Sequence, residues 1–323
     1  MNCICYRHKV LPSSNLPSRQ QGTVIVVALF LVALVATMSY TMMFRLGRDI
    51  ERTRLILNNI QAELYAQGAV AWAKDTLKLN WETQKSNQLI DKMPVVAPVN
   101  IVNGYEITST ITNIQVGFNI NNLINENVPQ EFLRMLQILF PNLENETLSQ
   151  LVNAIVDWVS PPREENEYAR YYLNLSLPYR AAHRPVVSIS ELLLVKGMKE
   201  NVLAKLAPYL MALPVNIQTN IQFAPPLVLM TLSPQITLSS AQSLADWFAH
   251  NKNATMDTIK NLDIFKNNQI TSDKMLLVSQ FFLLETKVRI EDQPFMLYTL
   301  LERVTSGNQA VINIVWQSQN LIN

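Results

Sequence analysis

Four carboxylates fall within residues 157–167 and could bind a hard metal ion. They are Asp157, Glu164, Glu165 and Glu167, in a segment that also holds Pro161 and Pro162. Calcium is bound by about six to eight oxygen ligands, which often come from loops of this kind. Arg163 and Arg170 would offset the negative charge, so a solvated acidic loop is the alternative interpretation.

Residue patterns for catalysis are sparse elsewhere. The three histidines are His8, His183 and His250, and none has a second histidine or a cysteine beside it to form a metal-ligand cluster. The chain has only seven glycines and no Gly-x-Ser-x-Gly sequence, so neither a glycine-rich phosphate loop nor a nucleophile elbow is expected. The sequence therefore predicts a protein that is not an enzyme.

The peptide bond between Gly22 and Thr23 is a predicted processing site. Residues 1–22 carry Arg7, Lys9 and Arg19 without an acidic residue, and an uncharged apolar run follows directly. In an ordinary secretory signal the cleavage site comes after the apolar run. Cleavage at Gly22 would instead leave the apolar segment as the N-terminus of the mature protein, as in the leaders of type IV pilins and pseudopilins, which this arrangement resembles.

The apolar run is long enough to cross a membrane. Val24 to Phe44 is 21 residues without a charge, and as a helix it spans roughly 30 Å, the thickness of a bilayer core. A buried helix of a soluble core is the alternative. Basic residues flank the run on both sides, so a count of positive charges does not decide its orientation.

Helical periodicity continues beyond the membrane segment. Ile50, Leu57 and Leu64 recur every seven residues with Ile60 on the same side, and no proline occurs between Gly22 and Pro94. A single helix over residues 23–79 would be roughly 85 Å long. Two helices with a hinge near Gly47 are the alternative, because glycine disfavours a helix interior by about 1 kcal/mol. We expect the face that carries Ile50, Leu57, Ile60 and Leu64 to contact partner helices or the protein's own head.

The remaining patterns predict an α+β fold. Residues 95–118 contain strand signals around an Asn-Gly turn, helical patterns fill the next 150 or so residues, and strand signals return over residues 276–317. The expected arrangement is a long N-terminal helix on a small antiparallel sheet, with a large helical insertion between the strands. The predicted divisions are residues 1–22 (leader), 23–44 (transmembrane segment), 45–118 (helix continuation and first strands), 119–274 (helical insertion) and 275–323 (last strands).

Charge and cysteine content exclude other classes. Hydrophobic residues make up 49% of the chain and charged residues only 16%, which suits a membrane-anchored protein with a packed head. Without residues 1–22 the chain holds 23 basic and 25 acidic residues, a balance that opposes a nucleic-acid binder. Both cysteines, Cys3 and Cys5, lie in the leader, so the mature protein has no disulfide. A membrane-anchored periplasmic enzyme or a DNA-uptake component remains the alternative function.

Several segments together resemble the minor pseudopilin K family of bacterial type II secretion systems. They are the leader with its apolar helix and residues 61–73, 171–185, 188–198 and 279–303. The resemblance implies a subunit at the tip of a periplasmic pseudopilus, which starts and caps its assembly with minor pseudopilins I and J for the export of folded proteins. It also implies cleavage by the prepilin peptidase, N-methylation of Thr23, and anchoring in the inner membrane with a cytoplasmic N-terminus and a periplasmic head.

Two comparisons with the family pattern concern single positions. Most pilins have Glu at the fifth mature position, whereas members of this family lack it, and Val27 agrees with the family. Some related proteins bind calcium near an Asp-Trp segment, but this chain has Ser160 in place of a second Asp and Asn166-Glu167-Tyr168 in place of a Gly-Ala-Glu stretch. These departures argue against an inherited calcium site, and no cofactor is expected to be required.

Overall fold

The computed structural model describes most of the chain. The described residues are 21–83, 94–102, 104–162, 167–251, 254–268, 270, 274–290, 293–307 and 309–319, with only the backbone described at 21, 22, 83, 167 and 293. The leader residues 1–20 and the carboxylates Glu164 and Glu165 therefore lie outside the described residues. The chain forms two compact units, Met1–Ile60 and Gln61–Asn323.

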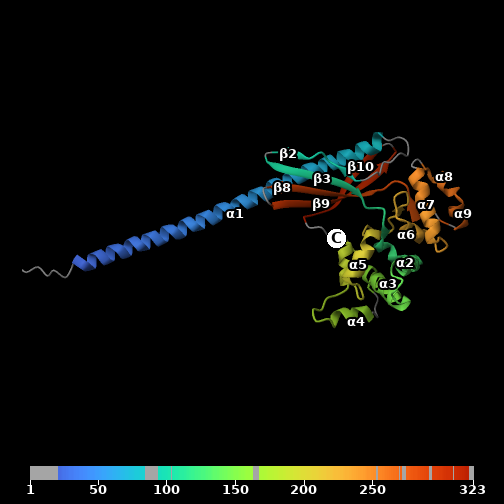
Figure 1. Ribbon diagram of the computed structural model, residues 1–323, viewed down its shortest axis with the longest axis horizontal. Helices are drawn as coiled ribbons and strands as arrows, with labels where there is room; N and C mark the ends of the chain where they lie inside the picture. Colours follow the sequence, from blue (N-terminus) through green and yellow to red (C-terminus); the bar gives the residue numbers. More distant parts are fainter. Residues whose placement is uncertain are drawn as a thin grey trace, which may run out of the picture. The chain divides into compact units, whose positions relative to one another are not determined.

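One helix runs from the apolar segment into the second unit. α1 spans Gln21–Thr83 without a break (Figure 1). Gly47, the position of the alternative hinge, lies inside it, and no heavy atom outside the local helix comes within 4 Å of a Cβ built there. Arginine, leucine, methionine and glutamate surround this glycine, and the propensities of these strong helix formers outweigh its cost of about 1 kcal/mol.

The main sheet belongs to the second unit. Among the described residues it has six strands in the order β1-β3-β8-β9-β10, with β2 paired to β3, and all pairs are antiparallel. The strands are β1 Val95–Val96, β2 Asn100–Val102, β3 Tyr105–Asn113, β8 Phe281–Ile290, β9 Gln293–Ser306 and β10 Gln309–Ser318. Gly104 has a φ of 84° in the turn between β2 and β3, a conformation that glycine adopts without strain. The predicted α+β fold, with a long helix on an antiparallel sheet, is confirmed.

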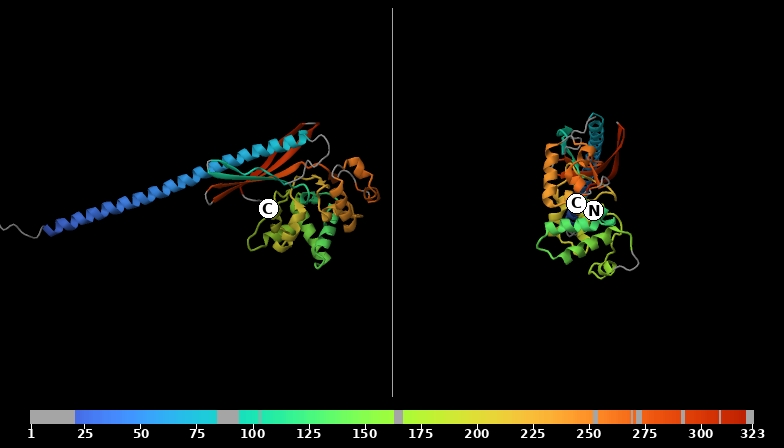
Figure 2. Two further views of the ribbon diagram at one scale, coloured as in Figure 1. Left: turned by 45° about the horizontal axis from the view of Figure 1, so that its top comes forward. Right: turned by 90° about the vertical axis from the view of Figure 1, so that its right-hand side faces the viewer.

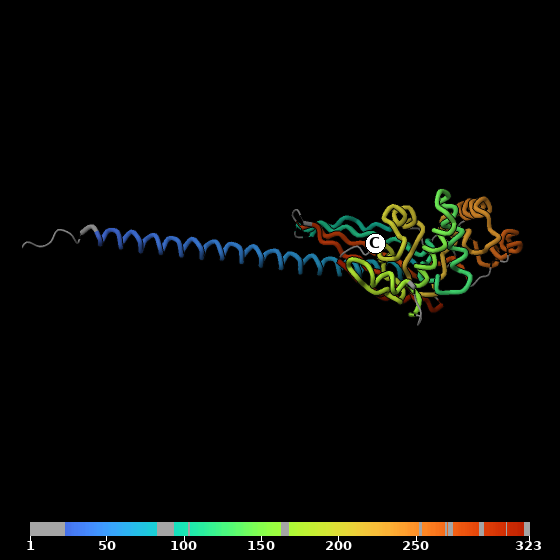
Figure 3. The backbone as a smooth tube through the Cα atoms, turned by 90° about the horizontal axis from the view of Figure 1, so that it is seen from below, coloured from blue at the N-terminus to red at the C-terminus, as the bar shows by residue number. Residues whose placement is uncertain are grey.

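The helical block lies in the chain between β3 and β8. Its helices are α2 Val128–Leu139, α3 Asn145–Val159, α4 Glu167–Leu173, α5 Glu200–Leu206, α6 Pro226–Leu229, α7 Leu238–His250, α8 Met256–Lys260 and α9 Asp263–Asn267. Its 3₁₀ segments are η1 Ile120–Ile124, η2 Ile189–Leu194, η3 Ala207–Tyr209 and η4 Met230–Leu232. Figures 1 and 3 show these elements, from green to orange, beside the strands.

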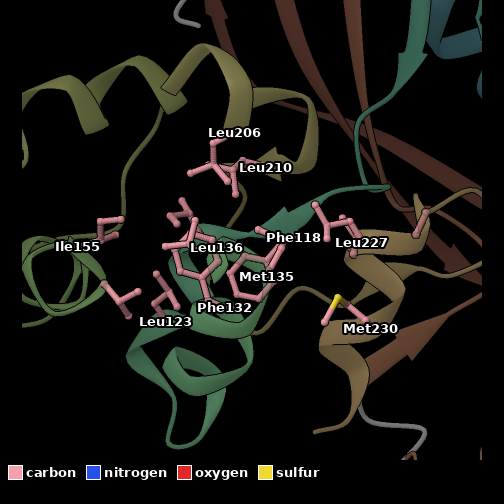
Figure 4. Packing of buried hydrophobic residues seen from close by; sticks show 14 of the residues in the cluster. Phe118, Leu123, Phe132, Met135, Leu136, Ile155, Leu206, Leu210, Leu227 and Met230 are labelled. Atoms are coloured by element: carbon pink, nitrogen blue, oxygen red, sulfur yellow. The ribbon is translucent and has the colours of Figure 1, made fainter. Parts of the chain in front are cut away.

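Apolar side chains from the whole length of the block meet in one core. Phe118 stacks on Phe132 with ring centroids 4.9 Å apart, and both rings are buried. Leu136 of α2, Leu206 of α5 and Met230 of η4 are buried in the same cluster (Figure 4). Because these residues come from distant parts of the block, the block packs as one hydrophobic core rather than as a string of separate helices.

Two small parallel sheets lie at the predicted ends of the helical block. β4 (Phe118–Asn119) pairs with β5 (Leu210–Met211), and β6 (Thr219–Asn220) pairs with β7 (Met275–Leu276). The predicted boundaries at 118/119 and 274/275 therefore fall at strands that pair with the interior of the block. Gly117 allows the first contact, because a Cβ there would lie 2.9 Å from the Leu210 backbone.

Buried amide side chains join the sheet to the helical block. Gln115 is fully buried; its Nε2 donates to the Gln218 carbonyl (2.7 Å), and its Oε1 accepts from the backbone N–H of Gln280 (2.6 Å). Asn220 of β6 is also fully buried, and its Nδ2 donates to the Leu277 carbonyl (3.2 Å) and to the Ser279 hydroxyl oxygen (2.8 Å), just before β8. Each amide satisfies backbone groups that would otherwise be buried without partners. These contacts, called here the amide joint, fix the block to the sheet.

The second half of α1 packs on the sheet through small side chains. Ala62, Ala66 and Ala73 are fully buried against the apolar face formed by Phe282, Leu284 and other sheet residues. Figure 2 shows this part of α1, in cyan, running along the strands. Alanine leaves little side-chain volume between the helix and the strands, so the two backbones approach closely. We call Ala62, Ala66, Ala69, Val70, Ala73 and Leu77 the alanine face.

The C-terminal end of α1 is held by a buried arginine of β9. Arg303 is 1% exposed, and its guanidinium carbon lies 5.4 Å from the Trp81 ring centroid and 4.8 Å from that of Phe282. Its Nη2 donates to the Ser279 carbonyl at 2.6 Å. A cation between two aromatic faces gains roughly 2 kcal/mol or more when it is desolvated, so this contact stabilises the docked end of the helix.

We expect Ala66→Leu to destabilise the head by about 1–3 kcal/mol, because a larger side chain cannot be accommodated between α1 and the sheet. The matched control is Ala71→Leu, the same substitution at an exposed position of the same helix, which should change stability by less than about 0.5 kcal/mol. Chemical unfolding of the purified protein measures both. Equal stability of the two variants would contradict the packing described here.

Candidate functional site

The apolar half of α1 has the properties of a membrane segment. Within the described residues it is the one helix long and apolar enough to cross a membrane by length and composition. Its polar side chains are partly satisfied within the helix, since the hydroxyls of Thr37 and Thr41 donate to the carbonyls of Leu34 and Met38, each at 2.8 Å. Internal bonds of this kind are needed where no water is present. The helix fits single-pass anchoring in a membrane.

The predicted processing residues lie at the start of this helix. α1 begins at Gln21, so Gly22 and Thr23 are both in its first turn, and Val27 is 57% exposed one turn further on. Cleavage between Gly22 and Thr23 stays a prediction, as does N-methylation of Thr23. The structure places Val27 among other exposed apolar side chains such as Val24 and Leu31.

The predicted partner face of α1 is exposed. Ile50, Leu57 and Ile60 have exposed fractions of 60%, 55% and 49% in the first unit. In the second unit Leu64 is 67% exposed, whereas Ala62 and Ala66 on either side of it are fully buried. Leu64 therefore points away from the sheet, and the protein's own head does not cover it.

Sequence reasoning missed the alanine face. Its residues recur at intervals of three and four, which is the spacing of one side of a helix. The signal was present in residues 61–73, but alanine contributes little to a hydrophobic pattern beside leucine and isoleucine. In the second unit the alanine face is thus turned toward the protein's own sheet, whereas Leu64 is left outward.

Polar contacts mark the point where α1 meets the sheet. The Tyr105 hydroxyl of β3 donates to Gln61 Oε1. The Tyr105 ring lies 5.0 Å from the ring of Tyr65, centroid to centroid. Further along, Trp72 and Trp81 are partly buried at the same contact. These aromatic residues flank the alanine face and fix the rotation of α1, which in turn fixes the direction of Leu64.

Asp157 is the one calcium candidate whose side chain the structure describes. It lies near the end of α3, and α4 begins at Glu167. The carbonyl oxygens of Asp157 and Ser160 lie 3.1 and 3.2 Å from His183 Nδ1. Because both partners are acceptors, this nitrogen carries the proton. Two carbonyl oxygens beside the candidate site thus accept a hydrogen bond from a side chain.

The described residues near Asp157 include an aromatic cluster. Trp158 is buried against Tyr172, with centroids 5.4 Å apart, and its Nε1 donates to Glu191 Oε1 at 3.2 Å. Burial raises the pKa of the Tyr172 hydroxyl to about 12, so it is protonated at neutral pH and its oxygen accepts from the Lys196 backbone N–H. Among the described residues no group of three or more His, Cys, Asp or Glu could hold a metal ion.

Comparison with known proteins assigns the chain to a family. A family model for type II secretion system (T2SS) protein K matches residues 117–215. The type II secretion system protein K of Pectobacterium carotovorum subsp. carotovorum is 28% identical over 305 residues, covering 88% of this chain and 93% of that protein. That of Klebsiella pneumoniae is 31% identical over 247 residues, covering 70% and 74%. The chain belongs to the type II secretion system protein K family. This confirms the resemblance noted in the sequence, and the protein is a minor pseudopilin of type II secretion.

A solved structure shares the fold. It is the crystal structure of the GspK–GspI–GspJ complex from the type 2 secretion system of enterotoxigenic Escherichia coli. The match has a TM-score of 0.64 at 19% identity and covers 83% of this chain and 99% of that chain. The family consists of secretion-system pseudopilins. The structural match confirms that this member has their α+β pilin fold, with a long N-terminal helix and an antiparallel sheet.

Calcium should have little effect on the stability of this family member, because the described oxygen atoms around Asp157 do not assemble a ligand set. A site filled at about 100 times its dissociation constant would add about 2.7 kcal/mol. Thermal melts with calcium and with chelator should therefore nearly coincide. A large drop with chelator that Asp157→Ala or Glu164→Ala abolishes would show a site that this interpretation misses.

Proposed function

We propose that this protein caps and starts the type II secretion pseudopilus together with minor pseudopilins I and J, so that folded proteins are exported across the outer membrane. The observation that carries the proposal is the exposed apolar face of α1, formed by Ile50, Leu57, Ile60 and Leu64. The related complex contains the three proteins GspK, GspI and GspJ. The role is structural, without catalysis or binding of nucleic acid.

Exposed leucine and isoleucine side chains on a helix need a partner. Leu57 and Leu64 lie two turns apart on one side of α1, and each leaves more than half of its surface exposed. Burying such a side chain contributes about 1.5–3 kcal/mol. Helices of neighbouring pseudopilins with similar apolar faces would cover them by ridges-into-grooves packing. We therefore assign Ile50, Leu57, Ile60 and Leu64 to the contact with these partners.

The proposal includes processing and topology. The prepilin peptidase cleaves between Gly22 and Thr23, and Thr23 becomes the methylated N-terminus. Before assembly the protein sits in the inner membrane with its N-terminus on the cytoplasmic side and its head in the periplasm. What supports this is the order of the sequence, in which the basic leader precedes the apolar helix and the folded head follows it.

Intact-mass measurement of the protein from membranes tests the processing step. We expect a chain that begins at Thr23 and carries one added methyl group. Gly22→Ala is the control: a peptidase that selects glycine before the bond should leave more of this variant at full length. A mature chain that starts after residue 44 would mean an ordinary cleaved signal and would contradict the pilin mechanism.

Leu57→Asp should greatly reduce the recovery of minor pseudopilins I and J with the tagged protein from membranes. Burying an unpaired carboxylate in an apolar contact weakens that contact by about several kcal/mol, the size of the desolvation penalty. Asn59→Asp is the matched control, because it adds the same charge on the other side of α1. If both variants recover the partners like the wild type, the apolar face of α1 is not the assembly contact.

Val27 is the residue that we connect with the tip position. In a filament, Glu at this position can pair with the terminal amine of a neighbouring subunit. A carboxylate without such a partner in an apolar environment has a desolvation penalty of roughly several kcal/mol, or it takes up a proton. A subunit at the tip has no neighbour above it, so an apolar Val27 avoids that cost. Its own Thr23 amine stays available to the Glu of a subunit that joins from below.

Val27→Glu should lower secretion or allow the protein into the filament shaft, whereas Val27→Leu should behave like the wild type because it stays apolar. Activity of the exported proteins in the medium and crosslinking along sheared pseudopili measure the two outcomes. Wild-type protein distributed along the shaft, rather than confined to one end, would rule out the tip assignment.

A further inference from the structure

A cleft with a volume of about 720 Å³ opens on the helical block between α3 and the segment that leads into α5. Its floor is apolar and contains the buried side chains of Phe140, Leu148, Leu151 and Val202. Lys196, Lys199 and Lys205 line it as well. The cleft has the size of a site for a small ligand or a few residues of a peptide, in the range of about 300–1,000 Å³.

A fixed turn sets the backbone of the first two lysines. Gly197 has a φ of 85°, a conformation in which a side chain would be strained. The N–H of Met198 donates to the Val195 carbonyl at 3.1 Å. The Lys199 carbonyl accepts from Val202 (3.0 Å) and Leu203 (2.9 Å), which starts α5. Lys196 and Lys199 therefore lie at the two ends of a hydrogen-bonded turn, and the turn requires the glycine between them.

The lysine side chains are arranged over aromatic rings. Lys196 Nζ lies 5.3 Å from the ring centroid of Tyr168 and 5.0 Å from that of Tyr171. Lys205 Nζ lies 5.1 Å from the Phe140 centroid and donates to the Leu139 carbonyl at 2.5 Å. Ring faces attract the ammonium groups without neutralising them. The ammonium groups of Lys196 and Lys205 are thus positioned at the cleft by these rings.

Among the described residues, positive charge outnumbers negative charge in the lining of this cleft. Over the described part of the chain no carboxylate forms an ion pair with Lys196, Lys199 or Lys205. The described lining holds one carboxylate, Glu146, whose Oε1 accepts from Gln150 Nε2 at 3.0 Å. The described lining therefore carries three cations and one anion, on a protein in which acidic residues outnumber basic ones once residues 1–22 are left out.

We propose that this cleft binds an acidic, extended peptide segment of a partner protein. Carboxylates of the segment pair with the three lysines, and an apolar side chain between them packs on Leu143 in the lining. Lysine ammonium groups on flexible stems suit carboxylates at variable spacing, since they act as point charges without the fixed fork of arginine. Leu143 is 40% exposed, and a simple anion would leave this apolar surface uncovered, which favours a peptide. The proposal goes beyond the assembly role of α1 and uses none of its residues.

Fluorescence anisotropy of a labelled Asp-Glu-Leu-Asp-Glu peptide with the purified full chain in detergent tests the cleft. We expect saturable binding at low salt that weakens about tenfold when the ionic strength rises from about 0.05 M to about 0.5 M, because exposed ion pairs are screened. The neutral Asn-Gln-Leu-Asn-Gln peptide should bind about tenfold more weakly or worse. Absence of saturable binding at low salt, or equal binding of the neutral peptide, would overturn the proposal.

Variants locate the binding on the molecule. Lys196→Gln, Lys199→Gln and Lys205→Gln together should weaken binding about tenfold, whereas the triple Arg variant should stay within about twofold. Lys199→Gln alone, at an exposed position, should weaken it about twofold without a change in the melting temperature. The control is Lys260→Gln, Lys266→Gln and Lys287→Gln, which removes the same charge elsewhere and should leave binding unchanged. A loss in the control equal to that in the cleft variant would show that net charge, not this cleft, binds the peptide.

Discussion

Close packing between the second half of α1 and the sheet is the constraint on which the rest of the structure depends. Alanine at positions 62, 66 and 73 lets the helix lie directly on the apolar faces of β8 and β9. Tyr105 and Trp81 fix its rotation through their contacts with Gln61 and Arg303. With this face packed on the sheet, Leu64 of the same part of the helix is left exposed. Leu64 thereby gives the docked part of α1 a second contact surface.

The amide joint has the same role for the helical block. Gln115 and Asn220 are buried, and their side chains bond to backbone groups across the joint, far away in the sequence. Leaving one such buried backbone group without a partner costs about 1–3 kcal/mol. Small movements of the block against the sheet would break several of these bonds at once. The block and the cleft beside Lys196 are thus carried rigidly by the pilin-like head.

The sequence allowed the family and much of the fold to be predicted. Three local signals were strong: the uncharged run, the seven-residue spacing of Ile50, Leu57 and Leu64, and the Asn-Gly turn near residue 104. Each lies in the predicted helix or strand region.

The packing of side chains was harder to predict. Alanine is a weak marker of a buried face, and Asn and Gln between strands resemble loop residues. Within the region of predicted helical patterns, residues 189–194 form a 3₁₀ segment, and α5 ends at Leu206 just before Pro208, which lacks a backbone N–H. The contact of His183 with the carbonyls of Asp157 and Ser160 could not be predicted from local residues, because His183 is distant in the sequence.

Disulfide crosslinking tests the central claim most directly, since both natural cysteines precede the predicted cleavage site. Leu64→Cys places a thiol on the exposed face of α1, and Ser243→Cys places one on the exposed surface of α7 as a control. Paired with single cysteines on the helices of minor pseudopilins I and J, position 64 should form crosslinks in membranes, whereas position 243 should not. Crosslinks at position 243 with none at position 64 would contradict the account, because the partners would then bind the helical block and not α1.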